Sequence, residues 1–529
     1  DINNMNFEAT AFLSLSDQEI VIIGESKVLS YSIVKRLEDE RTNEASYLTL
    51  PNELNPDDSA YNEALWYGEN GELTRALKAL RELGLSDFNS NISLRPIFVE
   101  ARGEKEEVIL ASLVVNATII NKIETEATTG SLVGKLIIPD NIVWDKTYVG
   151  DVETDKGELR RFLIAIDILL GENELETATF DVEKFFNTEE HPNRQATLLA
   201  SRLVEASVVN NIDKEMQVGG TLYETLVYPS NFTDNEWYGE TGELRRFLKA
   251  IEIIIGDNNF TTATFEVDKF LGPDQEDLLA SRLVEASVIK QIKETGKLTI
   301  PSNENPTRYY YFEDEELVWE RTFDEGELRR FLAGVKVLIG SSKFEDFVFD
   351  MNNLLDTDFT VVVQSRVLEE TLAKMIEDLL ASEGVLTNFI KTPVNGFQWF
   401  YHATSQNVDL DVRSVRRGEL ELTPTTNQYS DLLGFLNSIK EMNGTGLNFN
   451  FITIENIVAC DSEDLSDALW NYSRIMRGSI ATMLNEVVKQ SPIPEEYKPS
   501  FTDDDFQSQQ DVKDGLDDLK LIWNTYFGS

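Results

Sequence analysis

The heptapeptide Gly-Glu-Leu-Arg-Arg-Phe-Leu occurs three times in this chain, and a looser copy, Gly-Glu-Leu-Thr-Arg-Ala-Leu, precedes them. The copies begin at Gly71, Gly157, Gly242 and Gly326. Successive starts are about 85 residues apart, which is the signature of one duplicated supersecondary unit. A second motif, Ser-Arg-Leu-Val-Glu-Ala-Ser-Val, begins at Ser201 and is repeated letter for letter from Ser281. The sequence therefore predicts a tandem array, which constrains architecture more than activity.

Weaker copies of both motifs extend the array to six modules of about 85 residues. The serine motif has looser copies from Ser26, Ser112, Ser365 and Ser473, and the apolar register of the first motif recurs from Ser430 and Asp517. The predicted modules are 1–88, 89–174, 175–258, 259–342, 343–446 with an insertion near 394–427, and 447–529. Because arrays usually end in atypical capping units, we expect this array to continue beyond the present sequence.

Two amphipathic helices are predicted in each module. In the segment from Leu198 to Ile212, apolar residues recur three and four positions apart; we name this helix A. The segment that begins at Leu244 follows the same rule and stops at Gly256; we name it helix B. The carboxylate of Glu243 stands in the first turn of helix B, where it is expected to interact with unsatisfied amide groups and the helix dipole.

Short strands are predicted between these helices. Residues 262–267 alternate polar and apolar side chains, as do residues 177–182, and alternation is typical of a half-buried strand. Apolar runs that end in proline, such as residues 297–301, predict a second strand, and residues 318–323 a third. The predicted fold class is therefore α+β, a tandem array whose modules each hold two amphipathic helices and two to three short strands.

The composition of the chain limits the classes of molecule that it is expected to bind. The chain has 94 acidic and 47 basic residues, a net charge of −47, while 41% of its residues are apolar. That apolar content supports folded cores rather than acidic disorder. An acidic surface repels nucleic acids and anionic lipids, but calcium or basic proteins could bind it. No apolar run is long enough to insert into a membrane, so neither nucleic acid nor a membrane is an expected partner.

Two recurrent features have alternative interpretations. Tryptophans stand shortly before helix B at Trp66, Trp237 and Trp319. A packing role is expected, and stacking on a carbohydrate is the alternative. Arginine pairs at the start of helix B, such as Arg245-Arg246, could form an anion site, but pairing with the helix A glutamates Glu205 and Glu285 suits so acidic a chain better.

The fifth module carries an insertion of about 20 residues, and long insertions in arrays commonly form exposed binding loops. It is aromatic and basic, so the predicted partner site, against the alternative of an ordinary hairpin, comprises Trp399, Tyr401, His402, Arg413, Arg416 and Arg417.

Further along, Asp461, Glu463 and Asp467 are the best candidates for calcium. They lack the glycine and distant glutamate of an EF-hand loop, and a helix N-terminus explains them equally well.

Catalytic signatures are absent from the sequence, which has no phosphate-binding glycine loop, no His-Glu-x-x-His and no Gly-x-Ser-x-Gly. The two histidines, His191 and His402, recur in no other module, and the single cysteine, Cys460, stands in an apolar run typical of a buried thiol. We therefore expect no catalytic and no cofactor-binding residues.

The combination of helix A, a Leu-x-Ile-Pro run and a Gly-Glu-Leu-led helix B resembles the modules of very large, acidic, cysteine-poor surface proteins of low-GC bacteria. The resemblance is to a class and implies no site residues. It implies an extracellular stalk or adhesin whose signal and anchor lie outside this sequence, with another copy or a cell-surface protein as partner. A self-assembling filament, sheath or virion subunit is the alternative, followed by an array that binds ligands or carbohydrate; an enzymatic fifth module, using His402, Asp409, Asp411 and Arg413, is the least favoured.

Overall fold

The computed structural model describes residues 9–41, 48–85, 92–95, 104–144, 157–171, 173–189, 191–300, 319, 326–348, 354, 359–382, 436, 440, 474–502, 505–506 and 509–527. The chain divides into two compact units, Asp1–Thr264 and Phe265–Ser529, and each is described by itself.

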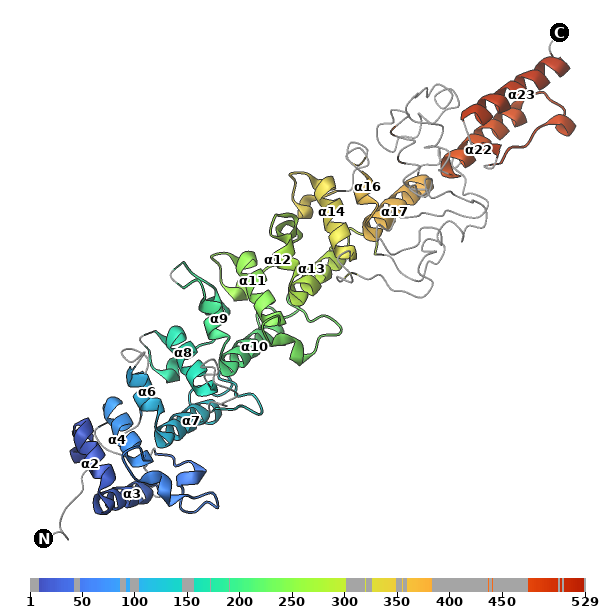
Figure 1. The fold of residues 1–529 in the computed structure, drawn as a ribbon. Helices are drawn as coiled ribbons and strands as arrows, with labels where there is room; N and C mark the ends of the chain where they lie inside the picture. The colour runs from blue at the N-terminus through green and yellow to red at the C-terminus, as the bar shows by residue number, and fades with distance from the viewer. Residues whose placement is uncertain are drawn as a thin grey trace. The chain divides into compact units, whose positions relative to one another are not determined.

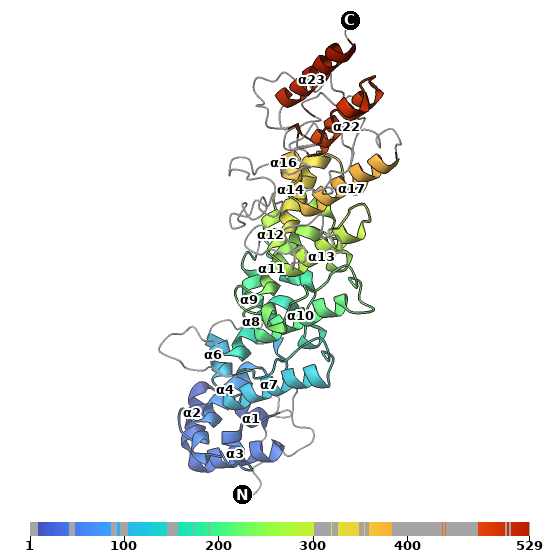
Figure 2. The same cartoon turned by 90° about the vertical axis from the view of Figure 1, so that its right-hand side faces the viewer.

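Unit 1 is built of α-helices and short 3₁₀ turns, which follow one another in chain order (Figures 1 and 2). The long helices that carry the serine motif (helix A) are α3 (Lys27–Arg41), α7 (Leu113–Thr128) and α10 (Arg202–Met216). The Gly-Glu-Leu helices (helix B) are α4 (Glu72–Glu82), α8 (Glu158–Leu170) and α11 (Glu243–Ile255). Shorter helices precede each helix A, namely α1 (Ala9–Leu13), α2 (Asp17–Glu25), α6 (Glu104–Leu110) and α9 (Arg194–Leu198). The 3₁₀ turns are η2 (Asn52–Leu54), η3 (Glu63–Trp66), η4 (Leu175–Thr177), η5 (Val182–Phe185), η6 (Asp234–Trp237) and η7 (Phe260–Thr262).

Unit 2 repeats this pattern where it is described. Its helix A elements are α13 (Arg282–Glu294), α17 (Arg366–Ser382) and α22 (Arg474–Gln490), and α14 (Glu327–Ile339) is a Gly-Glu-Leu helix. The remaining elements are η8 (Val267–Leu271), α12 (Gln275–Leu279), η9 (Phe344–Asp346), α16 (Phe359–Val362), η12 (Glu495–Tyr497) and α23 (Gln509–Phe527).

The ends of the helices follow from their sequences. Ser112 and Ser201 cap α7 and α10, because each hydroxyl accepts a hydrogen bond from the backbone N–H three residues on. Helix α11 ends where expected, at Gly256, whose φ of 54° is readily adopted only by glycine. Helix A was predicted to begin at Leu198; instead, a short break separates α9 from α10.

In the repeats whose helix B the structure describes, the core lies around that helix. On α11 the side chains of Phe247, Leu248 and Ile251 are fully buried, and burying a side chain of this size contributes about 1.5–3 kcal/mol. Edge-to-face aromatic contacts extend this core: the ring of Trp237 packs on Phe247 and that of Phe247 on Phe260. In unit 2, Trp319, Phe331 and Phe344 make the same series of contacts.

The predicted α+β class is wrong, since the described part of the chain contains no strand. The alternation over residues 177–182 does correspond to alternating burial, with Ala178, Phe180 and Val182 buried and the residues between them not. However, this segment is an extended connection between η4 and η5 that pairs with no neighbouring strand. A period of two reports an extended backbone with one buried face, and it does not by itself imply a sheet.

The proline-terminated runs are also extended connections rather than strands. Residues 48–51 and 136–139 have no regular secondary structure. The backbone N–H groups of Thr49 and Ile137 donate to side-chain hydroxyls of a helix rather than to a strand. Of the third predicted strand, residues 318–323, the structure describes only Trp319.

Candidate functional site

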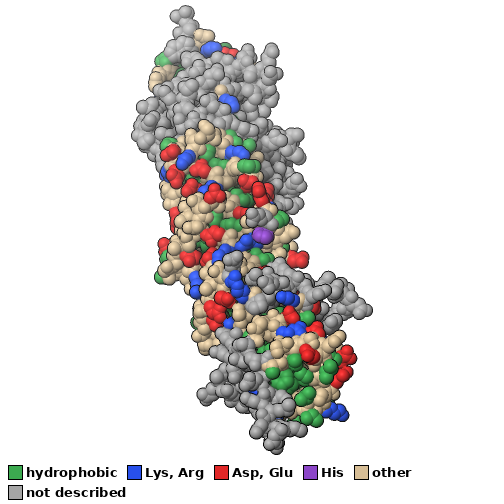
Figure 3. All heavy atoms as spheres, turned by 90° about the vertical axis from the view of Figure 1, so that its left-hand side faces the viewer, with side chains coloured by type: hydrophobic (Ala, Val, Ile, Leu, Met, Phe, Trp, Pro, Cys, Tyr) green, Lys and Arg blue, Asp and Glu red, His purple; other side chains and the backbone are tan. Residues whose placement is uncertain are grey.

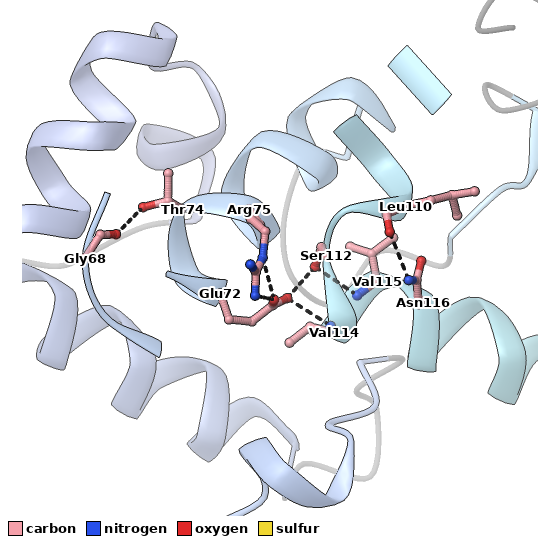
Figure 4. Close-up of polar contacts among 9 residues, drawn as sticks. All are labelled: Gly68, Glu72, Thr74, Arg75, Leu110, Ser112, Val114, Val115 and Asn116. Atoms are coloured by element: carbon pink, nitrogen blue, oxygen red, sulfur yellow. Dashed lines mark hydrogen bonds and ion pairs between the residues drawn. The ribbon is translucent and has the colours of Figure 1, made fainter. Parts of the chain in front are cut away.

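The most regular polar arrangement in the structure joins helix B of one repeat to helix A of the next. In its first copy, the Glu72 carboxylate lies at the start of α4 and accepts hydrogen bonds from the hydroxyl of Ser112 at 2.6 Å and the N–H of Val114 at 3.0 Å (Figure 4). The guanidinium of Arg75, one turn along α4, binds the second oxygen of Glu72 at 3.0 Å. We name this arrangement the glutamate joint.

The same joint recurs with the same atoms in later repeats. Glu158 accepts from the hydroxyl of Ser201 at 2.7 Å and the N–H of Leu203 at 3.2 Å. Glu327 accepts from the hydroxyl of Ser365 at 2.7 Å and the N–H of Val367 at 3.1 Å. The two partners stand 40, 43 and 38 residues apart in the chain in the three joints. Such recurrence indicates a structural connection between repeats rather than a site peculiar to one repeat.

Each joint caps a helix from two sides. The serine at the start of helix A accepts the N–H of the third helical residue, as Ser201 accepts that of Val204. The glutamate of the preceding repeat accepts the N–H of the second residue, Leu203. Two of the four unsatisfied N–H groups of helix A are thereby paired, one within the repeat and one across the boundary. The carboxylate also lies at the positive end of the helix dipole.

All four glutamates of the Gly-Glu-Leu motif are buried: Glu72, Glu158, Glu243 and Glu327 are at most 1% exposed. Each pairs with the arginine three residues on in the same helix; these arginines are Arg75, Arg161, Arg246 and Arg330. Burial of a carboxylate is costly unless it is paired and hydrogen-bonded, and these contacts meet that requirement. The glutamates are therefore structural. They stand in the first turn of their own helix, as predicted, and Glu72, Glu158 and Glu327 also accept hydrogen bonds from the following helix A.

A second connection joins the proline-terminated runs to the following helix A. The N–H of Thr49 donates to the hydroxyl of Thr118 at 3.0 Å, and that of Ile137 donates to Ser207 at 2.9 Å. In unit 2 the N–H of Thr299 donates to Thr371 at 2.9 Å. We name this contact the hydroxyl bridge. It satisfies extended backbone that would otherwise need a sheet partner.

In each bridge the hydroxyl also donates to the carbonyl four residues earlier in its own helix. Thr118 donates to Val114, Ser207 to Leu203 and Thr371 to Val367, at 2.6–2.7 Å. One side chain thus serves both as donor within helix A and as acceptor for the neighbouring repeat.

The first arginine of each pair has a different role. Arg160 binds Glu107 of α6 at 2.5 and 2.9 Å, and Arg329 likewise binds both carboxylate oxygens of Glu276 of α12. Arg245 instead donates to backbone carbonyls, that of Gly239 at 3.0 Å and that of Leu199 at 3.4 Å. The arginine pairs therefore hold short helices and loops in place.

Glu205 of helix A, one of the predicted arginine partners, is only 6% exposed. Burial raises the pKa of its carboxyl, while the charge of Arg245 and the N–H of Gly239 act in the opposite direction. Pairing of Arg245 with Glu205 was predicted; the hydrogen bonds of Arg245 go instead to backbone carbonyls, and its charge acts to lower the pKa of Glu205.

The tryptophans before helix B lie in the core. Trp66, Trp237 and Trp319 are 0%, 2% and 6% exposed, so their ring faces are covered by protein. This burial favours the packing interpretation over stacking on a carbohydrate. Trp144 is half-buried, and its indole N–H donates to Glu124 at 3.2 Å.

The remaining predicted sites are not placed by the structure. The partner-site candidates Trp399, Tyr401, His402, Arg413, Arg416 and Arg417 and the calcium candidates Asp461, Glu463 and Asp467 lie outside the described residues, as do Asp409, Asp411 and Cys460. His191 is described and exposed. Within the described ranges, no group of three or more His, Cys, Asp or Glu side chains could hold a metal ion. No helix among the described residues has both the length and the apolar character required to cross a membrane.

The joint's serines and the bridge's hydroxyls were not predicted as connecting residues. The signal was present, because the serine and glutamate motifs recur together at a nearly constant separation. When two polar residues recur at fixed places in every repeat while the segment between them varies, a contact between the two residues is a reasonable prediction.

Comparisons with protein-family models, with curated proteins and with solved structures gave no match.

Proposed function

We propose that the chain is a non-enzymatic structural protein, a segment of a stalk or fibre that acts at a cell surface. The observation that carries this proposal is the glutamate joint, found with the same donors and acceptors at three boundaries between repeats. The most repeated polar side chains of the sequence connect modules and are buried in doing so. Buried connections of this kind join neighbouring modules into a continuous array.

Packing between neighbours supports the same conclusion. Helix α4 contacts α6 and α7 of the next repeat, α8 contacts α9 and α10, and α14 contacts α16 and α17. These three helix B elements therefore pack directly against the module that follows each of them. Arrays of this kind gain stability from nearest-neighbour interfaces and transmit a fixed geometry from one repeat to the next.

Small-angle X-ray scattering with in-line size exclusion tests the proposal. A compact chain of this length would have a radius of gyration of about 24 Å, and a stalk segment is expected to give a monomer with a much larger value. A compact monomer would contradict the proposal. The same measurement in EDTA and in millimolar calcium tests whether the acidic surface binds calcium.

The cell-surface location rests on composition, namely the net charge of −47 and a single cysteine. Protease added to intact source cells is expected to degrade the protein while a cytosolic marker survives. Protection of the protein in intact cells would contradict this part of the proposal.

Self-assembly into a filament is a second candidate. It is favoured by one observation, the exposed apolar side chains on the first repeat. A mass that rises with concentration during size exclusion would support the filament, and a constant monomer mass would support the stalk.

A further inference from the structure

The first repeat carries one half of a glutamate joint. Its helix A, α3, begins after Ser26, which corresponds to Ser112, Ser201 and Ser365 in the three complete joints. The Ser26 hydroxyl accepts the N–H of Leu29, the third helical residue, as in the other repeats. No carboxylate among the described residues reaches the Ser26 hydroxyl or the N–H of Val28.

The exposed fractions of equivalent residues differ between the first repeat and the later repeats. Val28 is 76% exposed, whereas the corresponding Val114, Leu203 and Val367 are at most 1% exposed. Ser26 is half-buried, whereas Ser112, Ser201 and Ser365 are 0% exposed. In the later repeats these positions are covered by helix B of the preceding repeat, so the first repeat exposes a surface that the array elsewhere buries.

The two helices that meet at this half-joint, α2 and α3, carry further exposed apolar side chains. Ile22 of α2 is 61% exposed and Tyr31 of α3 is 57% exposed. Figure 3 shows hydrophobic side chains gathered near the lower, N-terminal end of the molecule. A repeat that caps an array has a polar outer face, and a cluster of exposed apolar side chains is typical of an interaction site. The sequence Ser-Lys-Val at 26–28 also retains the pattern of the buried copies.

We propose that the face formed by Ile22, Ser26, Val28 and Tyr31 binds the start of a Gly-Glu-Leu-led helix from another repeat of this type. The glutamate of that helix accepts from the Ser26 hydroxyl and the Val28 N–H, and the leucine after it covers Val28. The three complete joints found among the described residues specify this occupant. The inference rests on the proposed function, because it describes how such an array is extended.

A chain extended by one repeat at its N-terminus provides enough residues for the added helix B to reach Ser26. A copy of residues 175–258 placed directly before Asp1 puts the glutamate of its helix B roughly 41 residues ahead of Ser26, about half of the array's period. The separations in the three complete joints are 38, 40 and 43 residues. The added repeat can therefore reach the half-joint without a new linker.

Thiol labelling of Val28→Cys, in a chain that also carries Cys460→Ala, tests the proposal with and without the added repeat. The introduced thiol is expected to react rapidly in the unextended chain and about tenfold or more slowly in the extended chain, because reaction then requires local opening. Glu→Ala at the added copy's position 243 is expected to restore rapid labelling. Val218→Cys of the original chain, at a position 83% exposed, is the reference and should not change.

Equal labelling at position 28 in both chains would overturn the inference, as would slow labelling in the unextended chain, which would mean that the face is already covered. Amide exchange at Val28 and Leu29 in chains with the native Val28 provides a second readout if the Val28→Cys variant folds poorly. These two amides must become more protected from exchange when the repeat is added. An elongated monomer by scattering with no protection at Val28 would reject this inference and leave the proposed function intact.

Discussion

The hydroxyl of Ser201 lies 2.7 Å from the carboxylate of Glu158, although the two residues are 43 positions apart in the sequence. Both side chains are buried. The contact connects the N-terminus of one helix to the N-terminus of another in the next repeat. A carboxylate at that place accepts hydrogen bonds from amide groups of a helix to which it does not belong, so the stability of α7, α10 and α17 depends on the repeat before each of them.

Replacement of the joint's glutamate is expected to destabilise the folded protein strongly. Glu158→Ala leaves the Ser201 hydroxyl, the Leu203 N–H and the Arg161 guanidinium without their shared acceptor, and each buried donor left unpaired costs roughly 1–3 kcal/mol. Urea unfolding followed by far-UV circular dichroism should show a lower midpoint for the variant.

Glu189→Ala is the control, because Glu189 is exposed in the same unit. Its unfolding free energy is expected to stay within about 0.5 kcal/mol of the parent value. Equal effects of the two substitutions would show that the joint contributes little.

The serines of the complete joint and of the half-joint give a matched comparison. Ser26→Ala removes an N-cap and is expected to cost about 1 kcal/mol. Ser201→Ala removes a similar cap together with the hydrogen bond to Glu158, and bonds to charged groups contribute about 1.5–3 kcal/mol more. A double-mutant cycle of Ser201→Ala with Glu158→Gln should show coupling, measured by urea unfolding. Equal costs of the two serine variants, without coupling, would contradict this account.

The helices could be predicted from the sequence because their signal is local. The apolar spacing, the Gly-Glu start and the terminal Gly256 of helix B correspond to α11, which runs from Glu243 to Ile255. The strands could not be predicted correctly. Ala178, Phe180 and Val182 are buried in alternation, as in a sheet, but a sheet requires a partner strand, and that is a non-local property.

The candidate site was predicted only in part. The glutamates of the Gly-Glu-Leu motif were expected to be structural, but their acceptor role toward another repeat was not foreseen. Pairing of Glu243 with Arg246 follows from their separation of three residues in one helix and could have been read from the sequence. Pairing with Ser201 in the case of Glu158 depends on how repeats stack, which one period of sequence does not specify.

The raised pKa of Glu205 should make the stability of the protein depend on pH. Burial raises the pKa of this carboxyl above its ordinary value of 4.5, against the charges of Arg245 and Arg202, while Glu158 adds to the increase. A raised pKa means that the folded state binds the proton more tightly, so this group's stabilising contribution is complete below pH 4.5 and is lost as the pH rises through the folded-state pKa. Glu205→Gln is therefore expected to be more stable than the parent at about pH 7.5.

The difference between Glu205→Gln and the parent should narrow as the pH is lowered toward 4.5, measured by urea unfolding at several pH values. Glutamine retains an oxygen that can accept the N–H of Gly239, so loss of that bond does not confuse the comparison. A destabilised variant near neutral pH, or a difference independent of pH, would show that ionisation of Glu205 does not oppose folding.

The hydroxyl bridge explains how extended segments persist without a sheet, and Thr118→Val tests it. Valine keeps the shape of threonine but leaves the N–H of Thr49 without its acceptor, which should cost about 1–3 kcal/mol. Amide exchange at Thr49 should accelerate. Thr128→Val is the matched control, since the Thr128 hydroxyl also donates to the carbonyl four residues earlier in α7 but is exposed. If both variants lose the same stability and the Thr49 amide stays protected, the hydroxyl serves only its own helix and the bridge does not hold adjacent repeats together.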